Sequence, residues 1–224
     1  PLLEDAGVPA TIFVTSEILG SPGVFWWDRL EHLVLDRAAS ADLLRVNLGG
    51  TDVELDVGTS EGRTRAFTVI QDDVRTWPPD EIQALLDNIE AQIGPTSVDL
   101  KSPSRLNLEQ LRAIGSSSLL DIGGHTRHHP MLSSLDRAQQ NDEIVQGKAD
   151  LEQALGRTVT TFAYPFGSPS SFTAETVELV RGAGFELACT TEQGRVMPNT
   201  DRYRIPRILM NDLGGRQFRH RLQW

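Results

Sequence analysis

The sequence predicts an α/β fold built on a parallel sheet. The first observation is that, from Asn107 onward, short apolar segments alternate with helical patterns, which is the arrangement of consecutive βα units. The second is the composition, since 39% hydrophobic and 23% charged residues are typical of a chain with a packed core. The third is the length of 224 residues, which suits one domain of moderate size or one domain with a large insertion.

The N-terminal part contains the first strand of this pattern. PLLEDAG is interpreted as the last turns of a helix that stops at Gly7, and Ala10–Thr15 is predicted as a buried strand. Because a domain seldom starts on the last turn of a helix, we expect sequence upstream of Pro1 to be missing. The aromatic stretch FWWDRLEHLVL follows, and apolar residues such as Trp26 and Leu30 recur in it at helical spacing.

The middle of the chain, about residues 36–105, lacks the regular alternation and is expected to be an insertion. Two alternating runs around a Gly-Gly pair predict a hairpin over about Leu43–Val57. Thr59–Arg65 is polar and is predicted to be a loop. DEIQALLDNIEAQIG, which follows a Pro-Pro pair, predicts a helix. The whole chain, residues 1–224, is therefore expected to be a single domain that carries this insertion.

The C-terminal half contains clear helix boundaries. Asn107 and Gln110 stand at capping-box spacing before the helix LEQLRAIG, and LLDIGG follows as a short strand. Ser134 is predicted to cap a long helix that stops at Gly156. Thr173 is predicted to open the next helix, and FELACTT and YRIPRILM are expected to be extended.

Charge and cysteine content exclude several classes of protein. The chain has 21 Lys plus Arg against 31 Asp plus Glu, a net charge of −10, and no basic run, so nucleic acid and anionic membrane are not expected as partners. Cys189 is the single cysteine, which excludes an internal disulfide and a CxxC zinc ribbon. No apolar run reaches the roughly 18 residues of a membrane span, so no transmembrane segment is predicted.

The sharpest chemical signal is GGHTRHHPML, residues 123–132. His125 and His129 are four residues apart, so in one helical turn both imidazoles would lie within reach of one metal ion. They directly follow an apolar strand, and sites in parallel α/β folds form at the C-terminal ends of strands. Pro130 would end the turn, and His128 would point about 100° away from His129 in a helix, so His128 is not taken as a ligand. The alternative is a polar loop with three histidines and no metal.

A second signal is FAYPFG, residues 162–167. An aromatic-Pro-aromatic-Gly turn at a strand end can present a backbone N–H to a pocket and line that pocket with rings. The alternative is a rigid turn with two core aromatics.

The two motifs in this order, together with VPATIFV near the start, resemble the polysaccharide deacetylases of carbohydrate esterase family 4. The family's H-[ST]-x-x-H-P motif matches His125, Thr126, His129 and Pro130, and the resemblance covers roughly residues 1–35 and 104–210. It implies a distorted (β/α) barrel. The family's T-F-D-D-G motif, which supplies the catalytic base and a metal-ligand aspartate, has no counterpart here, so the barrel is expected to lack its first strand.

Members of this family remove N- or O-acetyl groups from sugar polymers with a divalent metal. The resemblance therefore implies an acetylated glycan as substrate and Zn²⁺ as cofactor, with Co²⁺ or Mn²⁺ as alternatives, held by His125 and His129. It implies that the backbone amide of Phe166 stabilises the oxyanion. Thr126, Tyr164 and Trp26 are the candidate sugar-binding residues, although the Thr126 hydroxyl could instead make a local hydrogen bond. This substrate class suggests the cell envelope or secretion.

Three departures from the family pattern concern catalysis. Asp72-Asp73 is the only Asp-Asp pair, but it lies in the insertion and is not expected to replace the missing motif. Ala163 stands where the family often has Arg, and His220 is expected to be a surface residue rather than a general acid.

Three interpretations stay open. The first is a metal-dependent deacetylase whose first strand is missing from this sequence, the fragment itself being inactive. The second is a non-catalytic remnant that binds carbohydrate or metal. The third is an α/β domain with coincidental histidines.

Overall fold

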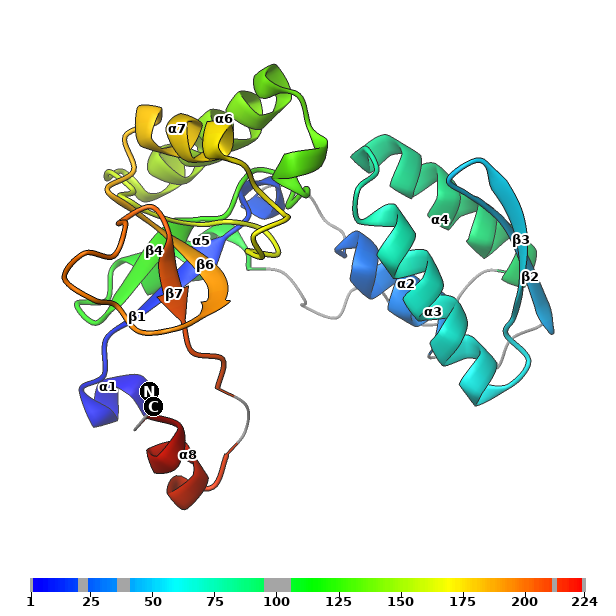
Figure 1. Cartoon of the computed structure of the whole chain (residues 1–224), viewed down its shortest axis with the longest axis horizontal. Coiled ribbons are helices and arrows are strands. Elements are labelled where there is room, and N and C mark those ends of the chain that lie inside the picture. The colour runs from blue at the N-terminus through cyan, green and yellow to red at the C-terminus, as the bar shows by residue number, and fades with distance from the viewer. Residues whose placement is uncertain (1, 20–23, 36–40, 95–105, 211–212, 223–224) are drawn as a thin grey trace.

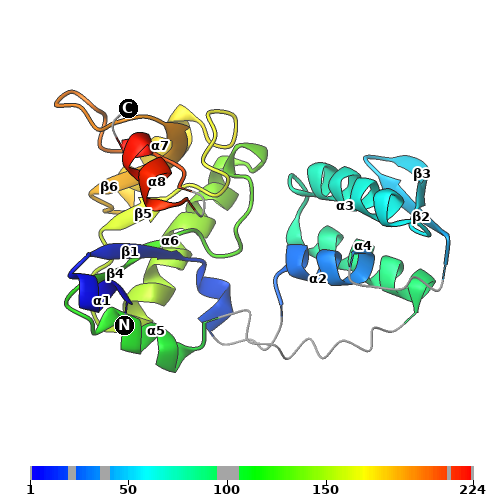
Figure 2. The same cartoon turned by 90° about the horizontal axis from the view of Figure 1, so that it is seen from below.

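The structure, a computed structural model, describes residues 2–19, 24–35, 41–94, 106–210 and 213–222. Figure 1 and Figure 2 show that these residues form two bodies. We call the body that carries the large sheet the sheet lobe, and the body made of a hairpin and three helices the hairpin lobe.

The sheet lobe contains five parallel strands: β1 (Ala10–Val14), β4 (Leu120–Gly124), β5 (Thr161–Ala163), β6 (Leu187–Gln193) and β7 (Ile205–Arg207). They pair in this order, so each strand lies beside the preceding strand of the lobe. The sheet is therefore wound in one direction, as in β/α barrels, without the reversal of a doubly wound sheet. The predicted parallel α/β fold is confirmed, and within the described residues the sheet is open, with β1 and β7 at its edges.

The sheet lobe also contains helices. They are α1 (Leu2–Ala6), η1 (Ser16–Leu19), α5 (Leu108–Gly115), η2 (Leu132–Ser134), α6 (Arg137–Leu155), α7 (Ala174–Gly182) and α8 (Gly215–Leu222). In Figure 1, α6 and α7 lie together above the sheet. No helix in the described part of the chain is long and apolar enough to cross a membrane.

The helix caps decide where these elements begin. The capping box of Asn107 with Gln110 is confirmed at α5, and Thr173 caps α7 as predicted. The predicted cap of α6 is wrong, because Ser134 belongs to η2. Asp136 caps α6, and its side chain accepts a hydrogen bond from the Gln139 N–H at 2.8 Å. An aspartate followed three residues later by glutamine forms the reciprocal box that a lone serine cannot.

The hairpin lobe contains α2 (Trp26–Val34), β2 (Leu43–Leu48), β3 (Thr51–Asp56), α3 (Ser60–Val74) and α4 (Pro79–Ile93). The predicted hairpin and the helix after the Pro-Pro pair are confirmed.

The predicted loop over Thr59–Arg65 is wrong, because α3 begins at Ser60 with Thr59 as its N-cap. The buried residues Ala66, Ile70 and Val74 are four apart, so the preceding polar residues simply continue the solvent face of one helix.

Each lobe has its own apolar core. The core of the sheet lobe includes Ile122, Phe162 and Leu151, and the core of the hairpin lobe includes Leu30 and Ile70. Leu30 lies on α2, so the hairpin lobe begins before residue 36, where the insertion was placed from the sequence. The description of the chain as a single domain stays a prediction.

Candidate metal centre

The two histidines of the sequence motif lie side by side in a loop that follows β4. The ring centroids of His125 and His129 are 4.8 Å apart. The expected helical turn is wrong, because Thr126 and His129 adopt positive φ angles of 64° and 63°. The Thr126 hydroxyl sets this shape: it accepts a hydrogen bond from the His129 N–H at 3.0 Å and donates one to the His125 carbonyl at 2.5 Å. We call residues 125–130 the His loop.

His125 is held as a neutral ring with one nitrogen available. Its Nδ1 lies 2.6 Å from the carbonyl oxygen of Ala163, so Nδ1 carries the proton and donates it. The lone pair of Nε2 is then available to a ligand. Burial of the ring lowers the pKa of His125 to about 4, which keeps the imidazole neutral at pH 7.

His129 is also neutral, and it has an unpaired nitrogen. Burial, followed by the proximity of His125, lowers the pKa of His129 to about 3. Its Nδ1 is buried and has no hydrogen-bond partner among the described residues. Because buried polar atoms nearly always have a partner, such an atom needs an explanation, and two neutral imidazoles at this separation fit a divalent cation. Within the described part of the chain, no group of three His, Cys, Asp or Glu side chains completes the site.

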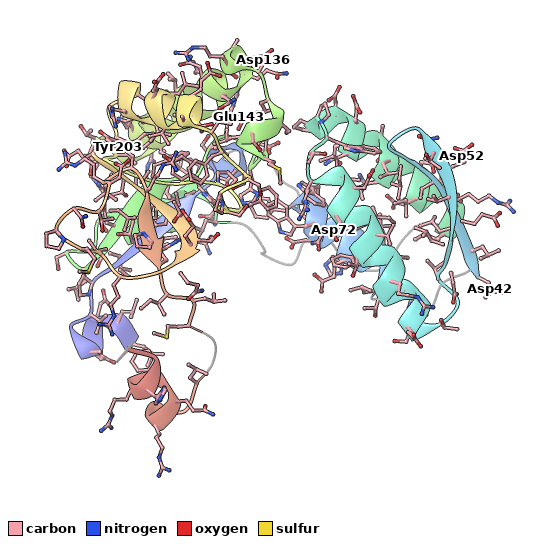
Figure 3. The ribbon with its side chains drawn as sticks, viewed as in Figure 1. Asp42, Asp52, Asp72, Asp136, Glu143 and Tyr203 are labelled. Atoms are coloured by element: carbon pink, nitrogen blue, oxygen red, sulfur yellow. The ribbon has the colours of Figure 1, made fainter. Side chains whose placement is uncertain are left out.

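Glu143 on α6 anchors the His loop. Its Oε2 accepts hydrogen bonds from the backbone N–H groups of Arg127 and His128, at 3.1 and 2.9 Å. Its Oε1 lies 2.6 Å from Nδ1 of His128, and this hydrogen bond raises the pKa of His128. His128 is thereby turned toward α6, whose residue Glu143 is labelled in Figure 3. Sequence reasoning missed Glu143, because no local pattern links a helix residue to loop residues 15 and 16 positions earlier.

The FAYPFG turn lies against the His pair. Phe166 has a positive φ of 60°, and its ring centroid is 5.1 Å from that of His129. Thr191 holds the turn, with its hydroxyl donating to the Phe166 carbonyl at 2.8 Å and its N–H to the Gly167 carbonyl at 2.9 Å. The N–H of Phe166 has no acceptor within the described residues, so this amide is available to a bound molecule.

Two of the predicted sugar-binding residues have buried side chains that hydrogen-bond within the protein. Tyr164 is 1% exposed, stacks on Phe172, and donates its hydroxyl to the carbonyl of Tyr203 at 3.0 Å. It lies two residues after Phe162 and continues the same core-facing side of the chain. Thr126 is also 1% exposed, and its hydroxyl is used inside the His loop. The structure therefore corrects the prediction for Tyr164, which is a core residue. For Thr126 it shows the local hydrogen bonds that the sequence left open as the alternative.

The two adjacent tryptophans of α2 have different neighbours. The ring centroid of Trp27 is 5.1 Å from that of His129, and Trp27 stacks on Phe25 at 4.4 Å. Trp26 packs against the core of the hairpin lobe and also lines a cleft that contains His129, so its contact with sugar stays a prediction. Sequence reasoning could not show which of the adjacent tryptophans contacts the His129 ring, because that depends on how α2 packs.

A cleft of about 240 Å³ separates the two lobes beside the His loop. We call it the interlobe cleft, and its lining includes Phe25, Trp26, Trp77, Asp80, His128 and His129.

Other charged candidates have clear positions. Asp72 lies on α3 in the hairpin lobe, as Figure 3 shows, and pairs with Arg75 at 3.3 Å, so it does not join the His pair. His220 is exposed on α8, as predicted. Arg207 on β7 was not predicted; its charge contributes to the low pKa of His125, and its Nε donates to the Thr190 carbonyl at 2.6 Å.

The sheet, the His loop after β4 and the aromatic turn after β5 can now be set beside what comparisons with known proteins found. The family model described as polysaccharide deacetylase matches residues 66–188. The chain belongs to the polysaccharide deacetylase family. The resemblance noted in the sequence is thus confirmed.

Individual relatives are distant. The chain is 25% identical over 103 residues to the Bacillus subtilis (strain 168) protein named "Putative polysaccharide deacetylase YxkH"; this match covers 46% of the chain and 36% of that deacetylase. A de-N-acetylase from Aggregatibacter actinomycetemcomitans superposes with a TM-score of 0.55 at 11% identity, over 99% of this chain and 68% of that one, which shows a shared fold. IcaB from Ammonifex degensii is 26% identical with a TM-score of 0.42, over 49% of each chain.

Proposed function

We propose that this polysaccharide deacetylase is a metal-dependent enzyme that removes acetyl groups from N- or O-acetylated polysaccharide. The observation that carries the proposal is the His pair: two buried, neutral imidazoles 4.8 Å apart, with the Nδ1 of His129 unpaired. Metal ligands must be deprotonated, and these two rings already are at neutral pH.

His125, through Nε2, and His129 would hold the cation, with Zn²⁺ as the first candidate and Co²⁺ or Mn²⁺ as alternatives. Such a cation supplies a nucleophilic water at neutral pH and polarises the acyl oxygen. The resemblance assigns a third ligand and the catalytic base to two aspartates, and no carboxylate in the described residues takes those places. Within the described residues β1 pairs on one side only, so a further strand that carries these aspartates would fit at its other edge.

The residues of the chain itself hold and shape this site. Ala163 fixes the tautomer of His125 through its carbonyl, and Glu143 holds the backbone of the His loop. The Phe166 N–H would donate to the acyl oxygen as negative charge develops there. Trp27 and Phe25 present an aromatic wall that excludes water and could stack on a sugar ring.

The test is acetate release by the complete gene product, of which these 224 residues are all or part. Acetylated chitooligosaccharides and O-acetylated xylan serve as substrates. Chelation should abolish release, and His125→Ala and His129→Ala should each reduce it more than 100-fold. His128→Ala should lose far less, because its ring bonds Glu143 rather than facing the pair. A His128→Ala variant that is folded but as inactive as His129→Ala would contradict the ligand assignment.

A second candidate function is metal or carbohydrate binding without catalysis. It is favoured by one observation, the absence of a third metal-binding side chain beside the His pair in the described residues. The 224-residue chain should then bind Zn²⁺ weakly in calorimetry at neutral pH. Tight, stoichiometric binding that is lost in His125→Ala would instead reveal a third ligand within the chain. Oligosaccharide binding by the complete gene product, without acetate release under any supplied metal, would favour this second function.

A further inference from the structure

The hairpin lobe contains a groove that the proposed chemistry does not use. It has a volume of about 980 Å³ and lies between the hairpin and α4. Val46, Val53 and Leu85 supply apolar surface, whereas Asn47, Glu81 and Asn88 are exposed polar residues of its lining. We call it the hairpin groove. A volume in this range is large enough for an oligosaccharide rather than a single sugar.

Trp77 connects this groove to the candidate metal centre. Its side chain lines both the hairpin groove and the interlobe cleft, and the cleft also contains His128 and His129. The ring packs against the core of the hairpin lobe, and the backbone N–H of Trp77 donates to the Val74 carbonyl at 2.9 Å, which fixes the backbone at this position. Figure 1 shows that the α3–α4 connection, which contains Trp77, lies on the side of the hairpin lobe that faces the sheet lobe. The two cavities therefore share one aromatic wall.

The polar lining indicates the class of ligand. Arg45 pairs with Glu54 at 2.6 Å, and the amide of Asn47 donates to Asp52 at 2.6 Å. Glu81, on the first turn of α4, has no ion-pair partner in the described part of the chain. With three carboxylates and one guanidinium, the lining is acidic, as is the whole chain at −10. An anionic polymer would be repelled, whereas a neutral or amine-bearing glycan would be accepted.

We propose that the hairpin groove binds the same glycan chain whose acetyl group lies at the His pair, several sugars away from the reacting unit. Trp77 would stack on the apolar face of a sugar ring at the junction, and Asn88 and Glu81 would bond hydroxyl or ammonium groups beyond it. Removal of an N-acetyl group leaves an ammonium group, so the acidic groove favours stretches of the polymer that are already deacetylated. This inference rests on the proposed function, because it takes the His pair as the reacting end.

Calorimetry on the complete gene product tests the groove without requiring catalysis. The probes are disaccharides and pentasaccharides of N-acetylglucosamine with β-1,4 and with β-1,6 linkage, and the corresponding glucosamine oligomers. At least one pentasaccharide should bind at least 10-fold more tightly than its disaccharide. Trp77→Ala and Glu81→Gln should each reduce this affinity ratio about 10-fold. Glu81 is exposed, so its variant keeps the test valid if Trp77→Ala unfolds.

The matched control is Glu31→Gln. Glu31 is an exposed glutamate on α2 of the same lobe, it lies outside the groove, and its variant should keep the wild-type ratio. The proposal is overturned if no pentasaccharide binds, if binding ignores both groove variants, or if a hexalysine peptide binds in the groove while the sugars do not.

Acetate assays separate the two proposals. Length-dependent binding that both groove variants weaken, without acetate release, would reject the deacetylase and keep the groove. Acetate release with the same preference for pentasaccharide over disaccharide in wild type, Trp77→Ala and Glu81→Gln would keep the deacetylase and reject the groove.

Discussion

At the residue scale, the His pair depends on two protein acceptors that lie outside its motif. The Ala163 carbonyl selects the tautomer of His125, and the Glu143 carboxylate collects the backbone N–H groups of Arg127 and His128. Partners of this kind fix the direction of a ligand's lone pair, and their loss typically weakens metal sites by 10- to 100-fold. The histidines supply the chemistry, and these acceptors supply its orientation.

Replacing Glu143 should therefore destabilise the His loop and lower the unfolding free energy of the protein. Glu143→Ala leaves the N–H groups of Arg127 and His128 without their acceptor, at a cost of about 2 kcal/mol in unfolding free energy. Glu143→Gln keeps one acceptor oxygen and should lose less. Denaturant unfolding measures both changes, and Asp142→Asn, on the exposed side of α6, is the control. Equal stability of Glu143→Ala and Asp142→Asn would show that the carboxylate does not hold the loop.

Tyr164 provides a second test at this scale, because the sequence suggested a sugar contact and the structure shows a core residue. Tyr164→Phe removes the hydrogen bond to the Tyr203 carbonyl and should cost about 1 kcal/mol of stability. The KM for acetylated oligosaccharide should stay unchanged, since the hydroxyl is buried. Thermal unfolding and steady-state kinetics of the variant check both parts. A raised KM at unchanged stability would instead support a contact between Tyr164 and the sugar.

At the element scale, α6 approaches the His loop so closely that one position on the helix must lack a side chain. A Cβ atom on Gly147 would lie 2.8 Å from the carbonyl carbon of Thr126 and 3.0 Å from the Arg127 nitrogen. Both are backbone atoms, which cannot rotate away as a flexible side chain could. Glycine lowers the helix propensity at this position, but the missing Cβ allows α6 to pack directly on the loop that carries His125 and His129.

Gly147→Ala should consequently destabilise the protein, although alanine is the better helix former. The expected loss is about 2 kcal/mol from overpacking against the Thr126 and Arg127 backbone. Gly182→Ala in α7 is the matched control, because its added Cβ meets nothing within 4 Å and should be neutral or gain up to about 1 kcal/mol. Chemical denaturation of the two variants measures the contrast. A Gly147→Ala protein as stable as Gly182→Ala would mean that the loop can move away from the helix.

Elements with a strong local signal were predictable from the sequence. The hairpin over Leu43–Val57 follows from alternation around a Gly-Gly pair, and α5 follows from its capping box. Secondary structure was predicted wrongly where the local residue types pointed to one structure and the wider context determined another. Thr59–Arg65 looks like a loop until Ala66, Ile70 and Val74 are read as one buried stripe. The His loop looked helical by spacing, but the Thr126 hydroxyl favours another turn.

The candidate site was predictable only in its motif residues. His125, His129 and the Phe166 turn are short patterns at strand ends, and the structure brings them together. Glu143 and Trp27 reach the same place from elements far away in sequence. Such contacts depend on how whole helices pack, and no periodicity within one segment encodes that.

At the scale of the whole molecule, the two lobes have separate apolar cores, so their stabilities should be separable. Ile70 is fully buried in the core of the hairpin lobe, and Leu151 is fully buried in the core of the sheet lobe. Ile70→Ala and Leu151→Ala should each cost about 3 kcal/mol, but in different unfolding transitions. Three of the four tryptophans, Trp26, Trp27 and Trp77, lie in the hairpin lobe, so fluorescence reports mainly on that lobe. The unfolding midpoint measured by fluorescence should therefore fall in Ile70→Ala and stay unchanged in Leu151→Ala. Unfolding followed by far-ultraviolet circular dichroism should show reduced stability in both variants. If each substitution lowers the fluorescence midpoint equally, the two cores unfold as one cooperative unit and the hairpin lobe is not an independent body.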